Sequence, residues 1–453
     1  MSHSDSAAIP RYGRRLRTTT LHDRYCSLLC FVLVGYAVSG KGFAYLGLPP
    51  LYIGEIALIL GLLVLVRTGC GSALLASPAS LLLVLLMTWV VLRMIPYVGS
   101  YGISAARDAV VVIYGLFAFI VMAVMLERPD RFRRVVTAYS RFAWIYGFIG
   151  LALLNSLYLL GTAMPTWPGN GQPIIFVRSG ELASHLSGAA AFALLGLMRT
   201  GRLWPIIMLI SLGFVSVSRG AMLAFVLPNI LAVAMARQKR RVLSALMVGV
   251  SLFGLAYAAG VDVPLPGGRS FGPQQIVDGV ESIIGTSNVS NLDGTKAWRL
   301  NWWNSIVNYT LHGPYFWTGK GFGMNLAEED GYVIGLELGG PTVRSPHNVH
   351  MTILARSGVP GLVLWLTTLA VWLGTLLNTA RIARRRGDGE WADVFIWIAC
   401  YCTAIVIDAS FDVALEGPML GIWFWCLFGL GIAGTMIYRT ELLGRRRQVA
   451  GSA

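Results

Sequence analysis

The sequence predicts an all-α membrane protein that crosses the bilayer about twelve times. Of its 453 residues, 55% are hydrophobic and 13% are charged, and the mean hydropathy is +0.64. Soluble domains carry about 25% charged residues. Because each crossing needs about 20 apolar residues, twelve crossings would use roughly half of a chain of this length. The composition thus excludes a soluble enzyme with one buried core, and it excludes a disordered scaffold.

Apolar segments, separated mostly by short polar connections, define the expected crossings. They are 25–40, 51–66, 79–96, 103–126, 135–161, 181–198, 203–217, 221–236, 242–260, 359–380, 391–409 and 419–438. We divide the chain accordingly into an N-terminal tail (1–24), nine crossings (25–260), a large loop (261–358), three crossings (359–438) and a C-terminal tail (439–453). The basic tail before the first segment resembles a signal peptide only in its charge, so we expect an uncleaved first crossing.

The distribution of positive charge predicts the orientation in the membrane. Lys and Arg number 36 against 22 Asp and Glu, which gives a formal net charge of +14. With the N-terminus inside, 24 of the basic residues lie on the inner side and 11 on the outer side. Because cytoplasmic loops are enriched in Lys and Arg, we expect both termini in the cytoplasm and the large loop outside. No patch in a soluble stretch alternates basic and aromatic residues, so we expect no nucleic-acid partner.

The large outer loop departs from the pattern of short connections. A loop of this length between apolar segments is usually functional. It is rich in aromatic residues, begins with Gly and Pro, and contains a predicted helix over 297–311 and glycine turns over 319–323. The acidic triplet 328–330 faces outward, away from cytoplasmic nucleotide sugars, and we interpret it as a solvated loop.

The end of this loop contains the candidate catalytic residue. Ser345 is a suitable N-cap and Pro346 a suitable first helical residue, while Gly358 marks a stop, so we expect about three helical turns before the tenth crossing. His347 would then lie in the first turn, where the helix dipole attracts anions and keeps a histidine neutral, as a general base requires. A hydrogen-bonded structural histidine is the competing interpretation. His350 would share the helical face, but no third ligand lies at helical spacing, so we expect neither a metal nor a cofactor.

Four arginines on the outer side oppose the positive-inside bias. They are Arg178, Arg219, Arg299 and Arg344. Snorkelling toward lipid headgroups explains any single one, whereas several converging guanidinium groups would form a diphosphate clamp. Nearby acidic residues leave two interpretations open: Asp408, Asp412 and Glu416 either contact an acceptor or form a solvated connection. We interpret the adjacent Arg107 and Asp108 as structural charge neutralisation.

Taken in order, these motifs resemble the O-antigen ligase and polymerase superfamily. The resemblance covers the second half of the chain, and the His-Asn, nine, Gly-x-x-Gly spacing matches the ligase signature. The motifs are Ser218-Arg219-Gly220, Arg299 followed by Trp302, Gly319-x-Gly321-Phe322-Gly323, and His347-Asn348 with nine residues before Gly358-x-x-Gly361. By this resemblance His347 corresponds to the essential histidine, and Arg219 and Arg299 to essential arginines. Arg178 and Arg344 are added by location, and Asn348 and His350 as supporting residues.

The resemblance implies an O-antigen ligase-like glycosyltransferase of the lipid-donor type in the bacterial inner membrane. It would move a glycan from undecaprenyl diphosphate to a hydroxyl of a lipid A core sugar on the periplasmic face, without a metal and with inversion. The alternatives are a polysaccharide polymerase that uses the same donor and a transporter of a lipid-linked sugar. An Arg, ten residues, Gly repeat found in one type of polymerase is absent, which favours the ligase. The long aromatic loop and the lack of paired broken helices count against transport.

Overall fold

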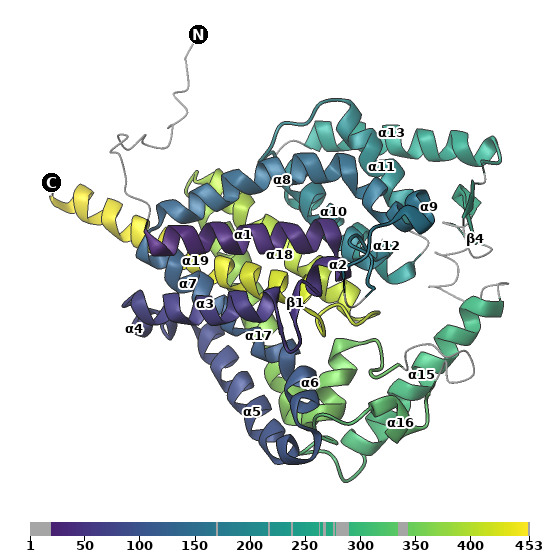
Figure 1. Ribbon diagram of the computed structural model, residues 1–453. Helices are drawn as coiled ribbons and strands as arrows, with labels where there is room; N and C mark the ends of the chain where they lie inside the picture. Colours follow the sequence, from purple (N-terminus) through teal and green to yellow (C-terminus); the bar gives the residue numbers. More distant parts are fainter. Residues whose placement is uncertain are drawn as a thin grey trace.

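Helices make up most of the structure (Figure 1). The computed structural model describes residues 20–168, 171–215, 218–236, 239–261, 263–265, 269–274, 277, 290–333 and 343–451. The helices are α1 (Leu21–Ser39), α2 (Lys41–Ala44), α3 (Ile53–Arg67), α4 (Gly71–Leu74), α5 (Pro78–Tyr101), α6 (Ile103–Ile113), α7 (Leu116–Glu127), α8 (Asp130–Leu154), α9 (Ser156–Leu160), α10 (Ser179–Leu194), α11 (Leu203–Val215), α12 (Arg219–Met235), α13 (Lys239–Ala258), α15 (Ser290–Leu311), α16 (Leu326–Asp330), α17 (Val349–Arg385), α18 (Gly389–Ala409) and α19 (Pro418–Gly451). The other labelled elements are a 3-10 turn, η1 (Gly161–Ala163), and two antiparallel hairpins, β1 (Gly47–Leu48) with β2 (Leu51–Tyr52) and β3 (Val263–Leu265) with β4 (Arg269–Phe271).

Six helices in the described part of the chain are long and apolar enough to cross a bilayer. They are α1, α5, α8, α17, α18 and the Pro418–Arg445 part of α19. α6 and α7 qualify as a seventh crossing if they are taken as one span, bent by 43°. The all-α membrane class is therefore confirmed, whereas twelve crossings remain a prediction. The crossing expected over 103–126 corresponds to the bent pair, and several other expected crossings correspond to shorter helices such as α11 and α12.

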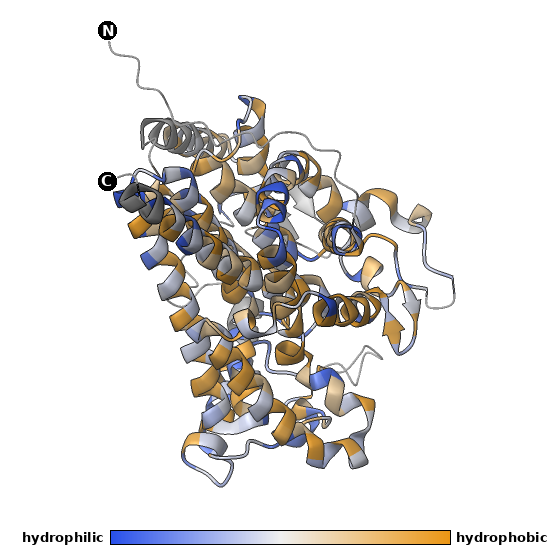
Figure 2. Cartoon of the chain, turned by 90° about the vertical axis from the view of Figure 1, so that its left-hand side faces the viewer, coloured by the Kyte–Doolittle hydropathy of each residue, from blue (hydrophilic) through white to orange (hydrophobic). Residues whose placement is uncertain are grey.

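The bundle has a buried centre and an apolar outer surface. The apolar stretch of α18 is 83% buried and that of α19 is 94% buried, against 17% for α5 and 28% for α1, α8 and α17. Figure 2 shows long apolar stretches in most of the helices. In water such exposed apolar faces would cause association, but in a bilayer they contact lipid tails. The outer helices therefore form the lipid-facing surface around α18 and α19.

Glycines allow the central helices to approach their neighbours closely. A Cβ at Gly429 of α19 would lie 2.3 Å from the carbonyl oxygen of Ala118 in α7, and a Cβ at Gly188 of α10 would lie 2.6 Å from the Tyr401 ring in α18. Small residues at helix contacts are how membrane helices gain van der Waals packing without a hydrophobic driving force. This packing fixes α18 and α19, and with them the connection between the two helices.

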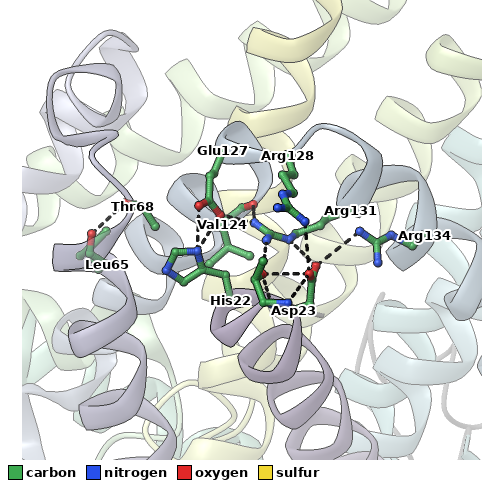
Figure 3. A network of polar contacts seen from close by, with 10 residues as sticks. His22, Asp23, Leu65, Thr68, Val124, Glu127, Arg128, Arg131 and Arg134 are labelled. Atoms are coloured by element: carbon green, nitrogen blue, oxygen red, sulfur yellow. Dashed lines mark hydrogen bonds and ion pairs between the residues drawn. The ribbon is translucent and has the colours of Figure 1, made fainter. Parts of the chain in front are cut away.

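One end of the bundle is held together by a network of ion pairs (Figure 3). Arg131 of α8 contacts Asp23 of α1 through its Nε at 2.8 Å and also pairs with Glu127 at the end of α7. His22 Nδ1 lies 2.8 Å from Glu127. Arg133 contacts Glu441 of α19 at 3.0 Å at the same end. The start of α1 and the later part of α19 therefore share one end of the bundle, and the cytoplasmic placement of both termini stays a prediction.

The described part of the large loop has a small core of its own. α15 and α16 pack against the first turns of α17 through the buried residues Trp302, Ile306, Leu326, Ala327, Leu354 and Ala355. The helix expected over 297–311 is present but begins earlier, at Ser290. The solvated loop expected over 328–330 is wrong for Asp330, whose side chain is 2% exposed. It pairs with Lys320 and accepts a hydrogen bond from Trp302 Nε1 at 2.7 Å.

Gly358 interrupts α17, where the stop signal was predicted. Its backbone has φ 72° and ψ −174°, and a Cβ there would lie 2.5 Å from the carbonyl oxygen of Phe316. That oxygen accepts from Val359 N at 2.8 Å, and Lys320 N donates to the Ala355 carbonyl at 2.7 Å. An interrupted helix leaves polar backbone groups without helical partners. These two hydrogen bonds to the loop provide partners for the groups at the break. Only glycine combines this φ with the close approach of a backbone oxygen.

We expect Arg131→Met to destabilise the protein by about 3 kcal/mol, because it removes the buried cation that Asp23 and Glu127 share and leaves these carboxylates only their other partners. Arg131 is 1% exposed, whereas Arg133, 41% exposed, provides the matched control. Arg133→Met should cost less than about 1 kcal/mol. Reversible unfolding in mixed micelles would measure both, and equal losses for the two variants would contradict the assignment.

Candidate active site

The candidate site gathers around the connection between α18 and α19, residues 410–417. Four other elements reach it: the starts of α10 and α12, the helix α15, and the segment before α17. Each of them carries one of the predicted site residues, namely Arg178, Arg219, Arg299 and His347. These residues are far apart in the chain. Arg178 and His347 contact Asp412, Arg299 contacts Phe411, and Gly220, next to Arg219, lies against Phe411.

His347 lies just before α17, not inside it. The expected helix start at Pro346 is wrong, because α17 begins at Val349 with Asn348 as its N-cap. The Asn348 side chain accepts from the backbone N–H groups of His350 at 2.9 Å and Met351 at 3.3 Å. His347 instead adopts a φ of 52°, a left-handed conformation that is uncommon for a residue with a side chain and that concentrates at functional sites.

This conformation directs the imidazole to Asp412. His347 Nδ1 lies 3.2 Å from Asp412 Oδ1, so the ionised carboxylate makes Nδ1 the protonated nitrogen and leaves Nε2 free to accept a proton. The backbone before the histidine is held by Trp303, whose Nε1 donates to the Pro346 carbonyl at 2.8 Å. The side chain of His347 is 25% exposed, which leaves it accessible to a substrate.

Asp412 joins the histidine to an arginine. Its Oδ2 lies 3.8 Å from Arg178 Nη1, and its Oδ1 also accepts from Val413 N at 2.8 Å. Burial alone would raise the pKa of Asp412, but the hydrogen bond from His347 and the charge of Arg178 outweigh it and lower the pKa. Asp412 is therefore ionised at neutral pH. The open alternative of a solvated connection is wrong for this residue.

Arg299 reaches the same turn from α15. Its Nη1 donates to the Phe411 carbonyl at 2.7 Å, while its buried Nε has no hydrogen-bond partner in the part of the chain that the structure describes. Burial, together with the positive charge of Arg219, lowers the pKa of Arg299 despite the attraction of Asp412. A buried donor without a partner beside a second cation forms a favourable anion-binding site.

Arg219 is the first residue of α12, and the helix start is pressed against Phe411. A Cβ at Gly220 would lie 2.7 Å from the Phe411 Cβ, so the small residue allows α12 to approach the connection. The Arg219 side chain is half-buried, and among the described residues it forms no ion pair with a carboxylate. The charges of Arg219 and Arg299 act on each other, and an anion between them would remove this repulsion.

Glu416, at the far end of the connection, lies beside the site. It accepts a hydrogen bond from Thr352 Oγ1 at 2.8 Å, and burial raises its pKa. The solvated connection that the sequence left open as an interpretation of Glu416 is therefore wrong as well. The contact joins the connection to the first turn of α17 and helps to keep His347 opposite Asp412.

Arg344 belongs to a different group of residues. Its Nη2 donates to the Gly323 carbonyl at 3.0 Å and lies 3.5 Å from Asp108 Oδ2. Asp108 also pairs with Arg356 at 3.0 Å and accepts from Gly323 N at 2.9 Å. These contacts fasten the glycine turns of the loop to α6, so the structural role expected for Asp108 holds. A diphosphate role for Arg344 stays a prediction.

His350 makes two contacts inside the protein. Its Nδ1 accepts from Trp365 Nε1 at 3.1 Å, and its Nε2 lies 3.2 Å from Ser410 Oγ. With Nδ1 as acceptor, Nε2 carries the proton and donates to the serine. His350 thus connects α17 to the end of α18, next to the turn that carries Asp412. Its role is one of support, as is the capping role of Asn348.

The pairing of Asp412 with His347 was not predicted from the sequence. The signal was present but weak: three acidic residues, Asp408, Asp412 and Glu416, lie at an outer end otherwise marked by unpaired arginines. Sequence spacing alone does not show which carboxylate meets an imidazole 65 positions away. Chemically, the site contains a histidine base, His347, that is oriented by the Asp412 carboxylate, with arginine side chains nearby.

We expect the pH dependence of stability to reveal the Asp412 contacts. A folded-state pKa below the ordinary value of about 3.9 adds stability that is complete above that value and lost as pH falls through the folded pKa. The advantage of the wild type over Asp412→Asn should therefore shrink as the pH falls from about 5 to 3 and the Asp412 carboxylate is protonated. Thermal unfolding over this pH range measures the difference, and an advantage that grows between about pH 5 and 3 would contradict it.

Residues 204–366 match the family described as O-antigen ligase. The matched segment contains Arg219, Arg299, Arg344 and His347, but not Arg178 or Asp412. No curated protein matches the sequence. The chain is therefore similar to the O-antigen ligase superfamily over residues 204–366, about a third of its length, and its apolar helices indicate a multi-pass membrane protein.

Proposed function

We propose that this protein is a glycosyltransferase that moves a glycan from undecaprenyl diphosphate to a sugar hydroxyl of the lipid A core. The observation that carries the proposal is the meeting of His347 with Asp412 beside the arginine pair Arg219 and Arg299. A base and a diphosphate seat are the two groups that this transfer needs, and the ligase family match supports the same class of reaction.

In the proposed reaction, His347 Nε2 accepts the proton of the acceptor hydroxyl. The hydroxyl oxygen forms a bond to the anomeric carbon while the bond from that carbon to the diphosphate breaks, which inverts the anomeric centre. Asp412 keeps the proton on Nδ1 and stabilises the imidazolium that forms, in the way that a triad aspartate does. The undecaprenyl diphosphate leaves with its charge neutralised by Arg219 and Arg299.

The supply of energy favours such a donor. In the predicted orientation the site faces the periplasm, where nucleotide sugars made in the cytoplasm are not available. A diphosphate leaving group brings the energy with the donor and needs charge neutralisation more than protonation. Guanidinium groups bind it with fixed geometry. We therefore place the protein in the bacterial inner membrane with its site on the periplasmic side.

His347→Ala should abolish transfer in cells that lack the native enzyme, because the acceptor hydroxyl loses its base. Lipopolysaccharide analysis should show bare core together with polymer that remains on its lipid carrier. His312→Ala, which changes an exposed histidine of the same loop, is the matched control and should restore the polymer-bearing product. Full restoration by His347→Ala would refute the proposal, and a core bearing a single repeat would indicate a polymerase instead.

Arg299→Lys should lower kcat/KM by roughly 100-fold or more, because lysine keeps the charge but loses the planar set of donors. Arg344→Lys tests the diphosphate role predicted for that residue, because an unchanged kcat/KM would leave Arg344 with only its contacts to Gly323 and Asp108. Purified protein in detergent, given lipid-linked donor and core acceptor, measures both. Product formed without a second compartment also excludes pure transport, while equal losses would place both arginines at the donor.

A further inference from the structure

An apolar cavity of about 130 Å³ lies away from the candidate active site, between α1, α7, α8, α18 and α19. Aliphatic and aromatic side chains and three thiols line it, among them Cys30 of α1, Phe142 of α8 and Trp423 of α19. Two of the lining residues, Val34 and Ala138, are exposed on the outer surface of the bundle. The cavity is therefore open to the lipid-facing side between α1 and α8.

Helical periodicity connects this cavity to the ion-pair network of Figure 3. Arg131 and Arg134 precede Ala138 by seven and four positions in α8, so they lie on the same helical face one or two turns away. In α1, Asp23 precedes the cavity-lining residue Cys26 by three positions, so it too lies one turn from the cavity on the same helical face. The site thus has an apolar body and a charged end, which is the shape of a lipid.

The charged end has an excess of cations. Arg128, Arg131 and Arg134 face two carboxylates, those of Asp23 and Glu127. Arg131 is buried within the network, but the side chains of Arg128 and Arg134 are 38% and 57% exposed. Their contacts with Asp23, at 3.5 and 3.4 Å, are long. Both guanidinium groups therefore have donors available for a further anion.

We propose that this site binds one anionic phospholipid from the leaflet next to Arg128 and Arg134, which is the inner leaflet in the predicted orientation. The lipid phosphate lies on Arg134 and Arg128, and one acyl chain fills the cavity between α1 and α8. Basic pockets between spans are where anionic headgroups bind. This proposal does not depend on the proposed catalytic function. The arginines proposed to bind the donor diphosphate lie near Phe411, on α12 and α15.

A lipid titration of the purified full-length protein in detergent tests this assignment. Phosphatidylglycerol should raise the thermal unfolding midpoint by several degrees and appear as a single adduct in native mass spectrometry, because a ligand of the folded state stabilises it. Phosphatidylethanolamine should have a much smaller effect. An equal response to both lipids would overturn the assignment of the charged end.

Two variants test the two ends of the site separately. Arg134→Gln should weaken the response to phosphatidylglycerol about tenfold, while Arg385→Gln, which removes an exposed arginine of α17, should not change it. Ala138→Trp should block the cavity and remove the adduct. An unchanged response in Arg134→Gln would overturn the proposal even if Ala138→Trp failed to fold. Displacement of the adduct by a polyprenyl diphosphate would assign the cavity to the donor tail and would also overturn it.

Discussion

The contact between Asp412 and His347 is the interaction on which the candidate site depends. The carboxylate meets the imidazole on one side and Arg178 on the other, so it joins three elements that are remote in the chain. It also decides the tautomer, because a carboxylate that accepts from Nδ1 leaves Nε2 without a proton. The packing of α18 and α19 in the centre of the bundle holds this carboxylate at a fixed position.

The connection between these two helices is short, and its side chains Ser410, Asp412 and Glu416 each contact another element. The Phe411 carbonyl accepts from Arg299, and Glu416 accepts from Thr352. These partners keep the charge of the Asp412 carboxylate compensated by Arg178 and His347. The Arg299 guanidinium at this turn keeps a buried Nε without a hydrogen-bond partner among the described residues, close enough to Arg219 for the two charges to act on each other.

The sequence was sufficient to predict the membrane class, the helix of the outer loop and the interruption near Gly358. Apolar length and glycine chemistry are local properties, so they are readable from the chain. The start of α17 was wrong by a few residues, since Ser345 and Asn348 are both good N-caps and only the folded chain selects between them. The conformation of His347 followed from that choice and was not predicted either.

The long-range part of the site was not readable. Arg344 and Arg299 looked equivalent in the sequence, yet Arg344 contacts Asp108 and Gly323, whereas Arg299 contacts Phe411. Asp412 was one of three acidic residues without distinguishing marks. Such partnerships depend on the relative placement of helices, which no single segment encodes.

The interruption of α17 at Gly358 has a consequence for how this protein can be recombined. Backbone bonds across the break, from Lys320 N to the Ala355 carbonyl and from Val359 N to the Phe316 carbonyl, make the loop and the helix below it one continuous unit. A chimera that exchanges the loop alone would separate donors from their acceptors at the break in the helix. A transplantable module must therefore run without interruption from α15 through the whole of α17.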